Sequence, residues 1–243
     1  MALTSMHTYH YTAEIHGMSL GAPVALATIS PMLRNTSMEQ GLANEIHIHV
    51  MKTRTWPEEI AMNEATLEVE DLVDRLSLID NHRVISVKYT GYQDESGTFH
   101  EPHKTGGMSA NAVAGLQDPL RYYERERQKR ILVGRLNPGL TRLHRTAQGM
   151  PNGIGKYLLL YGALQVMHGE TQAKVDEQLL KKRPDTLMVQ GKHRSETILS
   201  HLRNLIAHPE NDVDVHTLAR QAETYCPMLS ELVREELIGQ VLP

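Results

Sequence analysis

The stretch that decides the fold of the C-terminal half is SHLRNLIAHP, residues 200–209. At about 100° per residue, four apolar side chains fall on one side of a helix, namely Ile198, Leu202, Leu205 and Ile206. The other side carries Arg203, Asn204 and His208. Pro209 disfavours the α conformation for the residue before it, so we expect this helix to end at His208.

Three more helices are predicted around the one that we expect over residues 195–208. Residues 157–167 (YLLLYGALQVM) are apolar nearly all round, as in a buried bundle helix, and residues 173–182 form a shorter polar helix. Residues 215–241 repeat apolar side chains at helical spacing, with Pro227 as a candidate kink. Four helices in so short a stretch predict a compact bundle.

The N-terminal half has a different pattern. Residues 9–16 and 45–52 alternate apolar and polar side chains, and residues 82–92 are rich in β-branched and aromatic types, so all three are predicted strands. Between the last two, residues 57–79 repeat apolar side chains at near-helical spacing, among them Leu67. These elements predict a small α+β unit.

The fold class that we expect is therefore an α+β N-terminal domain followed by an all-α helical bundle. The small, polar stretch GGMSANAVAG at 106–115 is a candidate linker. It divides the chain into a domain of residues 1–115, whose role the sequence does not indicate, and a domain of residues 116–243.

Composition excludes several classes of protein. The chain has 243 residues, is 40% hydrophobic and contains one cysteine, Cys226, which rules out an intramolecular disulfide framework. No apolar run is long enough to span a membrane, and the start of the chain lacks the pattern of a signal peptide. We expect a cytoplasmic protein without a membrane partner.

The net charge of −4 is distributed very unevenly along the chain. Residues 121–145 hold eight Lys or Arg against two Glu, a net charge of +6, so the remainder is at −10. RNA contact and an ordinary solvated charged helix both explain this basic segment. The side chains taken as candidate RNA-binding residues are Arg121, Arg125, Lys129, Arg130, Arg142 and Arg145.

Arg203 and His208 together suit a phosphate. A guanidinium supplies a permanent positive charge, and a histidine at a helix C-terminus moves a proton. Glu196, two turns before Arg203 on the same predicted helix, is expected to orient the guanidinium. The plainer interpretation is a solvated helix face that ends in a His cap.

The segment Arg203-Asn204-x-x-x-His208, near the end of a bundle helix, resembles the HEPN family, whose signature is an Arg, often a polar residue, and then a His. The resemblance covers the C-terminal half only. It implies a metal-independent endoribonuclease that acts as a homodimer with a composite site. Arg203, Asn204 and His208 would be its catalytic residues, with Glu196 in a supporting role.

The resemblance further implies cleavage by 2′-OH attack, which leaves 2′,3′-cyclic phosphate ends, without cofactor or metal. RNA would be the substrate, the protein a toxin or phage-defence effector, and an antitoxin or other regulatory protein a partner. Some toxin members carry a Tyr two residues after the His; Glu210 stands there in this chain, which argues against that mode of control. The alternative is a non-catalytic HEPN-type dimerisation or binding module.

Three weaker patterns remain in the sequence. Gly17-Met-Ser19-Leu-Gly21 matches a hydrolase nucleophile elbow, but too few residues precede it for the parallel strands that such an elbow needs. His47 and His49 share one strand face without an evident third metal ligand. The glycines at 149–156 are out of register for a phosphate loop.

Overall fold

The structure is a computed structural model in which the chain divides into two compact units. Unit 1 comprises Met1–Pro138 with Val241–Pro243, and unit 2 comprises Gly139–Gln240. The boundary predicted after residue 115 lies outside the described residues. The residues described are 6–18, 20, 23–26, 35–42, 44–53, 58–79, 82–101, 128, 130–169, 171–208 and 214–241.

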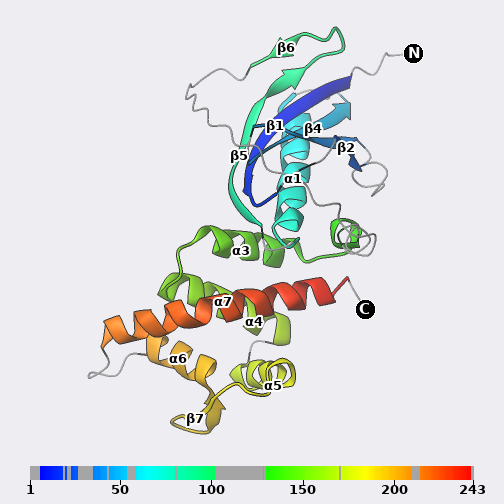
Figure 1. The fold of residues 1–243 in the computed structure, drawn as a ribbon. Helices are drawn as coiled ribbons and strands as arrows, with labels where there is room; N and C mark the ends of the chain where they lie inside the picture. Colours follow the sequence, from blue (N-terminus) through cyan, green and yellow to red (C-terminus); the bar gives the residue numbers. More distant parts are fainter. Residues whose placement is uncertain are drawn as a thin grey trace. The chain divides into compact units, whose positions relative to one another are not determined.

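Unit 1 is an antiparallel sheet in the order β2-β3-β4-β1-β5-β6 (Figure 1). Its strands are β1 (Met6–His16), β2 (Val24–Ala25), β3 (Thr36–Gln40), β4 (Glu45–Thr53), β5 (Arg83–Gln93) and β6 (Phe99–His100). The three predicted strands, at residues 9–16, 45–52 and 82–92, are confirmed as β1, β4 and β5. β5 curves along β1, with two shifts in register between these strands.

The sheet packs one face on helix α1 (Glu58–Leu76). Along β1 the side chains of Tyr9, Tyr11, Ala13 and Ile15 are buried, as a period of two requires of a half-buried strand. The buried side of α1 consists of Ala61, Ala65, Val69, Leu72, Val73 and Leu76. Leu67 was expected on this side but is 64% exposed, because it lies about 200° around the helix from Ala65.

Residues near the end of unit 1 are fixed to α1. The Arg75 guanidinium donates from Nη1 to the carbonyl oxygens of Ile131 (3.2 Å) and Gly134 (2.6 Å), and from Nε to Asp71 (2.7 Å). The first part of the basic segment that the structure describes therefore belongs to unit 1, whereas its last part, from Gly139 onward, belongs to unit 2.

Unit 2 is helical, as predicted for this half of the chain, with a short hairpin in addition. Its elements are α3 (Pro138–Gly149), α4 (Ile154–His168), α5 (Gln172–Lys182), β7 (Met188–Gln190), β8 (Ser195–Thr197), α6 (Ile198–Ala207) and α7 (Val215–Gly239). The helix expected from residue 195 begins only at Ile198, because residues 195–197 pair with β7. Pro227 lies inside α7 without ending it.

The core of unit 2 lies between α4 and α7, which cross in Figure 1. Its fully buried side chains include Tyr157, Leu160, Tyr161, Ala222, Cys226, Leu229 and Val233. The Tyr157 hydroxyl donates to the carbonyl oxygen of Leu199 at 2.6 Å, which ties α4 to the first turn of α6. No helix of the described residues has the length and apolar character of a membrane span.

Candidate functional site

Helix α6 carries the predicted catalytic residues and ends where the sequence predicts. Ala207 is its last residue, and His208 is the C-cap, with φ −136°, ψ 69° and a backbone N–H that donates to the Asn204 carbonyl at 2.8 Å. Pro209 lies outside the described residues. At the other end the Thr197 hydroxyl accepts from the Ser200 amide, which is a standard N-cap contact.

Asn204 is the centre of the side-chain contacts on α6. Its amide nitrogen donates to Glu196 Oε2 at 3.0 Å and to Gln172 Oε1 at 3.3 Å. Its amide oxygen accepts from Arg203 Nη1 at 3.3 Å and from the Gln172 amide nitrogen. Both ends of the Asn204 amide are therefore hydrogen-bonded, and the Arg203 guanidinium is one of the partners.

Glu196 does not occupy the position expected from the sequence. It was expected on the helix, two turns before Arg203, but it lies on β8. Its side chain is 7% exposed, with Oε1 3.1 Å from His201 Nδ1 and Oε2 bonded to Asn204. Because the residues before α6 are extended, Glu196 reaches the helix from the hairpin. It holds His201 and Asn204, and no contact with Arg203 is seen among the described residues.

A second buried carboxylate fixes the hairpin that carries Glu196. The Asp176 side chain on α5 is 5% exposed and accepts from Arg194 Nη2, from the Thr197 hydroxyl and from the Ser200 hydroxyl, each at 2.6 Å. Because Ser200 donates to Asp176, its oxygen accepts from the Tyr161 hydroxyl at 2.6 Å. Asp176 thus joins α5, the hairpin and the start of α6.

The phenol of Tyr161 stays protonated in this network. Burial is the main cause that raises its pKa to about 12, outweighing the hydrogen bond with Ser200. A protonated phenol is a donor at neutral pH, which is the role that the contact with Ser200 requires. This network therefore holds the N-terminal end of α6 in place.

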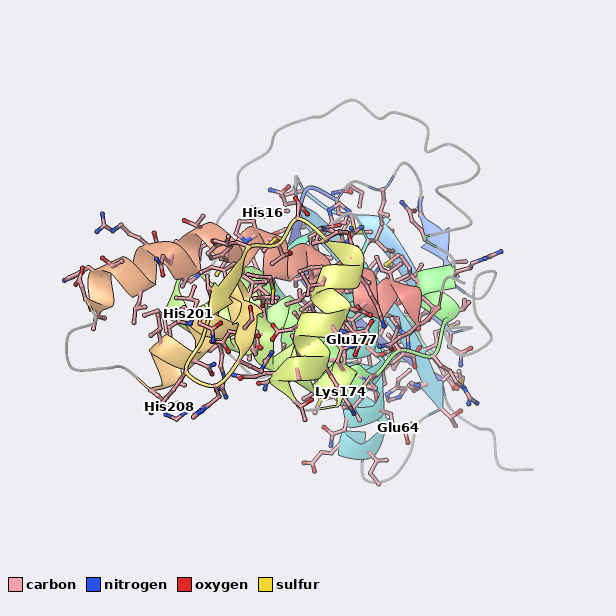
Figure 2. The ribbon with its side chains drawn as sticks, turned by 90° about the horizontal axis from the view of Figure 1, so that it is seen from below. His16, Glu64, Lys174, Glu177, His201 and His208 are labelled. Carbon is pink, nitrogen blue, oxygen red and sulfur yellow. The ribbon has the colours of Figure 1, made fainter. Side chains whose placement is uncertain are left out.

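The exposed part of the site lies towards the end of α6. His208 and Ala207 are exposed, and Arg203 is half-buried. Figure 2 shows His201 beside the β7–β8 hairpin and His208 at the far end of the helix. Ala207, the residue before His208, has a small side chain and is also exposed.

The candidate RNA-binding residues do not form one group in the described structure. Arg121, Arg125 and Lys129 lie outside the described residues. Arg130 is exposed in unit 1, whereas the exposed Arg142 and the half-buried Arg145 lie on α3 of unit 2. In Figure 1, α7 lies between α3, which carries these two arginines, and α6, which carries Arg203.

Two other patterns from the sequence take ordinary structural positions. Gly17 has φ 84° in the turn after β1, and β2 follows where a nucleophile elbow would need a helix; Ser19 and Gly21 lie outside the described residues. The glycine-rich stretch at 149–156 connects α3 to α4 and includes the first turn of α4. It is a connection between helices and not a strand-to-helix phosphate loop.

The histidines of the sheet form a contact group. On the face away from α1, His10 Nδ1 lies 2.7 Å from His49 Nδ1, and His49 Nε2 lies 3.2 Å from Glu39 Oε1. Burial, and then the proximity of His49, lower the pKa of His10. Within the described ranges no three His, Cys, Asp or Glu side chains are arranged to hold a metal ion.

The chain was compared with family models, with curated proteins and with solved structures, and none of the three comparisons gives a match. The resemblance to the HEPN family thus depends on Arg203, Asn204 and His208 and on their place at the end of α6.

Three residues of this site were not identified from the sequence, namely Gln172, His201 and Asp176. His201 has one signal that could have found it, because it precedes Asn204 by three residues and so shares its side of the helix. Gln172 and Asp176 come from α5, and a contact between two separate helices leaves no pattern in either one.

Proposed function

We propose that this protein is a metal-independent endoribonuclease of HEPN type, with Arg203, Asn204 and His208 as its catalytic residues. The observation that supports this most is the arrangement on α6. Arg203 and Asn204 are joined side chain to side chain, and the exposed His208 follows one helical turn after Asn204. A fixed positive charge and an accessible imidazole at the same end of a helix suit a phosphodiester.

The reaction would be an attack of the ribose 2′-OH on the adjacent phosphorus. The O2′–P bond forms as the P–O5′ bond breaks, which gives a 2′,3′-cyclic phosphate and a 5′-OH end. His208 would take the proton from the 2′-OH, and Arg203 would stabilise the charge that develops on the phosphoryl oxygens. Asn204 would hold Arg203 in place through the contact between their side chains.

The same proposal extends to the oligomeric state, the substrate and the biological role of the protein. Two copies would place their α6 ends together in a composite site, and RNA would be the substrate of a toxin or phage-defence effector in the cytoplasm. Unit 1 would sense a trigger, bind a regulatory partner or antitoxin, or select the substrate. These points extend the resemblance and are tested with it.

The test is incubation of total RNA with the purified protein in the presence of EDTA. We expect cleavage that leaves cyclic phosphate ends and that falls at least about a hundredfold in Arg203→Ala and in His208→Ala. Arg220→Ala and His216→Ala are matched controls, because both residues are exposed on α7, and they should retain full activity. Cleavage that persists in both α6 variants would show that the site is wrongly assigned.

One observation favours the alternative of a non-catalytic binding module. Both ends of the Asn204 amide are already occupied within the protein, and one partner is the carboxylate of Glu196. A carboxylate so near would repel a phosphate unless cations outweigh it. Under this alternative the wild-type protein forms a dimer or binds RNA but cuts none, and Arg203→Ala weakens binding only.

A further inference from the structure

The side chain of His201 is held by a buried carboxylate. Its Nδ1 lies 3.1 Å from Oε1 of Glu196, whose side chain is 7% exposed, whereas the side chain of His201 is 31% exposed. A carboxylate deep in the protein thus faces one nitrogen of a ring that reaches the surface. Carboxylate–imidazole pairs with this division of exposure orient the ring and leave its other nitrogen available.

The contact fixes which nitrogen carries the proton in the neutral ring. An ionised carboxylate only accepts hydrogen bonds, so Nδ1 carries the hydrogen and donates it to Glu196. Nε2 then has the free lone pair. Nε2 makes no hydrogen bond within the part of the chain that the structure describes, and the atom is not fully buried. Solvent or a ligand can therefore reach it.

The same carboxylate connects His201 to the proposed catalytic residues. The second oxygen of Glu196 accepts from Asn204, whose amide oxygen in turn accepts from Arg203. Along α6, His201, Asn204 and His208 are spaced by three and four residues, so they follow one side of the helix. A phosphodiester bound over this side of α6 would have His201 towards the start of the helix and His208 at its end.

We propose that His201 is a second proton-transfer residue of this site and that Glu196 is its positioning residue. The proposal rests on the ribonuclease function proposed above. Cleavage by 2′-OH attack moves two protons: one leaves the 2′-OH as the O2′–P bond forms, and one joins O5′ as the P–O5′ bond breaks. His208 takes the first, and a protonated His201 gives the second from Nε2.

Glu196 suits His201 to the second role. When the imidazolium gives up its Nε2 proton, the neutral ring that remains keeps its hydrogen on Nδ1, which is the tautomer that the carboxylate holds. Solvent then returns a proton to Nε2 and removes the one on His208. The base and the acid of this scheme therefore come from one helix and its C-cap.

The first experiment measures RNA cleavage as a function of pH for the wild type, His201→Gln and Glu196→Gln. We expect a bell-shaped profile for the wild type. In His201→Gln, kcat falls about a hundredfold and the limb that descends towards high pH is lost, with little change in KM. Glu196→Gln keeps the bell shape with a kcat about tenfold lower. His216→Gln is the matched control and should behave as the wild type.

A rescue experiment separates a chemical role from a structural one. Added imidazole should restore part of the activity of His201→Ala, because it supplies the missing proton, and should not restore Arg203→Ala. If His201→Gln keeps the rate and the pH profile of the wild type while His208→Ala and Arg203→Ala are inactive, His201 has no role in proton transfer, and the ribonuclease function stands without it.

A second readout applies even if the wild type cuts no RNA, which would defeat the proposed function itself. The ring signals of His201, assigned by comparison with His201→Gln, are followed by NMR as an RNA oligonucleotide fully methylated at its 2′-oxygens is added. We expect a shift at Nε2 and a protonated Nδ1. If this RNA binds without any shift at His201, or does not bind, the proposal for His201 is wrong.

Discussion

A histidine faces a carboxylate in each of the two units, and the two pairs differ in what they leave available. In unit 1, His49 uses both ring nitrogens, Nδ1 towards His10 and Nε2 towards Glu39. In unit 2, His201 uses Nδ1 alone, for Glu196. The second nitrogen decides whether such a pair can act on a ligand.

This difference shows why fourteen histidines in the chain indicate so little by their number. His10 and His49 bond to each other through their Nδ1 atoms, and burial, followed by the proximity of His49, lowers the pKa of His10. They fit a polar sheet face. His201 has a carboxylate behind it and an accessible nitrogen, so it is the better candidate for chemistry.

Of the changes considered, removal of Asp176 should disrupt the contact between His201 and Glu196 most, because this carboxylate fixes the hairpin that carries Glu196. Asp176→Ala leaves the hydroxyls of Thr197 and Ser200 without their acceptor and Arg194 without its partner. We expect the free energy of unfolding of unit 2 to fall by about 4 kcal/mol, measured by urea denaturation.

The neighbouring Glu177→Ala is the control for Asp176→Ala. Glu177 is exposed and pairs with Lys181 on the surface of α5, so its removal should leave the denaturation midpoint where it is. Equal midpoints for the two variants would show that the Asp176 contacts contribute nothing to stability.

His144 offers a third kind of histidine, buried and without a carboxylate. Burial, and then the cations Arg234 and Lys156, lower its pKa to about 4 from an ordinary value of 6.5. The unfolded chain therefore takes up this proton first as the pH falls. We expect the free energy of unfolding to drop by about 3 kcal/mol between roughly pH 7 and pH 4 on account of this residue alone.

The measurement for His144 is the unfolding free energy of the wild type and of His144→Leu across that pH range. Other groups titrate alike in both proteins, so the difference between the two curves isolates His144. The curves should diverge from neutral pH downwards in favour of the variant, and parallel curves would contradict a buried neutral ring.

Gly191 gives a steric way to separate Glu196 from His201 without removing either. A Cβ at this position would lie 2.6 Å from Glu196 Oε1 and 3.0 Å from the Arg194 carbonyl oxygen. We expect Gly191→Ala to displace the carboxylate and to slow RNA cleavage about tenfold, as the loss of a positioning partner does. The protonated Nδ1 of His201 should disappear from the NMR spectrum with it.

The control for Gly191→Ala is Gly162→Ala on α4, where a Cβ meets no atom within 4 Å. Because alanine is the better helix former, this change should raise stability by up to about 1 kcal/mol and leave cleavage unchanged. A cleavage rate in Gly191→Ala equal to that of the wild type would mean that Glu196 does not act through His201.

The smallest effects that we expect come from two buried tyrosines, one in each unit. Tyr157→Phe removes the hydrogen bond to Leu199 and should cost unit 2 about 1 kcal/mol. Tyr11→Phe removes a contact with the Thr66 hydroxyl, which also donates to the Met62 carbonyl, so the cost to unit 1 should be about 0.5 kcal/mol. Urea denaturation checks both values, and a larger loss for Tyr11→Phe would contradict them.

Local patterns account for the parts of the fold that were predicted correctly. Alternation located β1 and β4, β-branched and aromatic content located β5, and apolar content and spacing located α4, α6 and α7, whereas α3 was not predicted. These patterns come from residues that are close in sequence and face one core. Leu67 was placed on the wrong side of α1 because the alanines Ala61 and Ala65, which line the buried side, are weak signals of a core.

The β7–β8 hairpin was not predicted, and this explains the error over Glu196. Strands of three residues are too short to show a period of two. The sequence Ser195-Glu196-Thr197 also contains no Gly or Pro that would separate it from the helix that follows. Arg203, Asn204 and His208 could be located because they belong to one helix. Their partners on α5 and β8 depend on tertiary contacts, which the helix pattern does not contain.

The buried Cys226 gives the chain a built-in reporter. It is the only cysteine, it lies in α7 within unit 2, and burial raises the pKa of its thiol. An alkylating reagent needs an exposed thiolate, so it can react only after unit 2 opens. The rate of labelling at Cys226 therefore measures the opening of unit 2 in the intact chain, separately from that of unit 1, without an added tag.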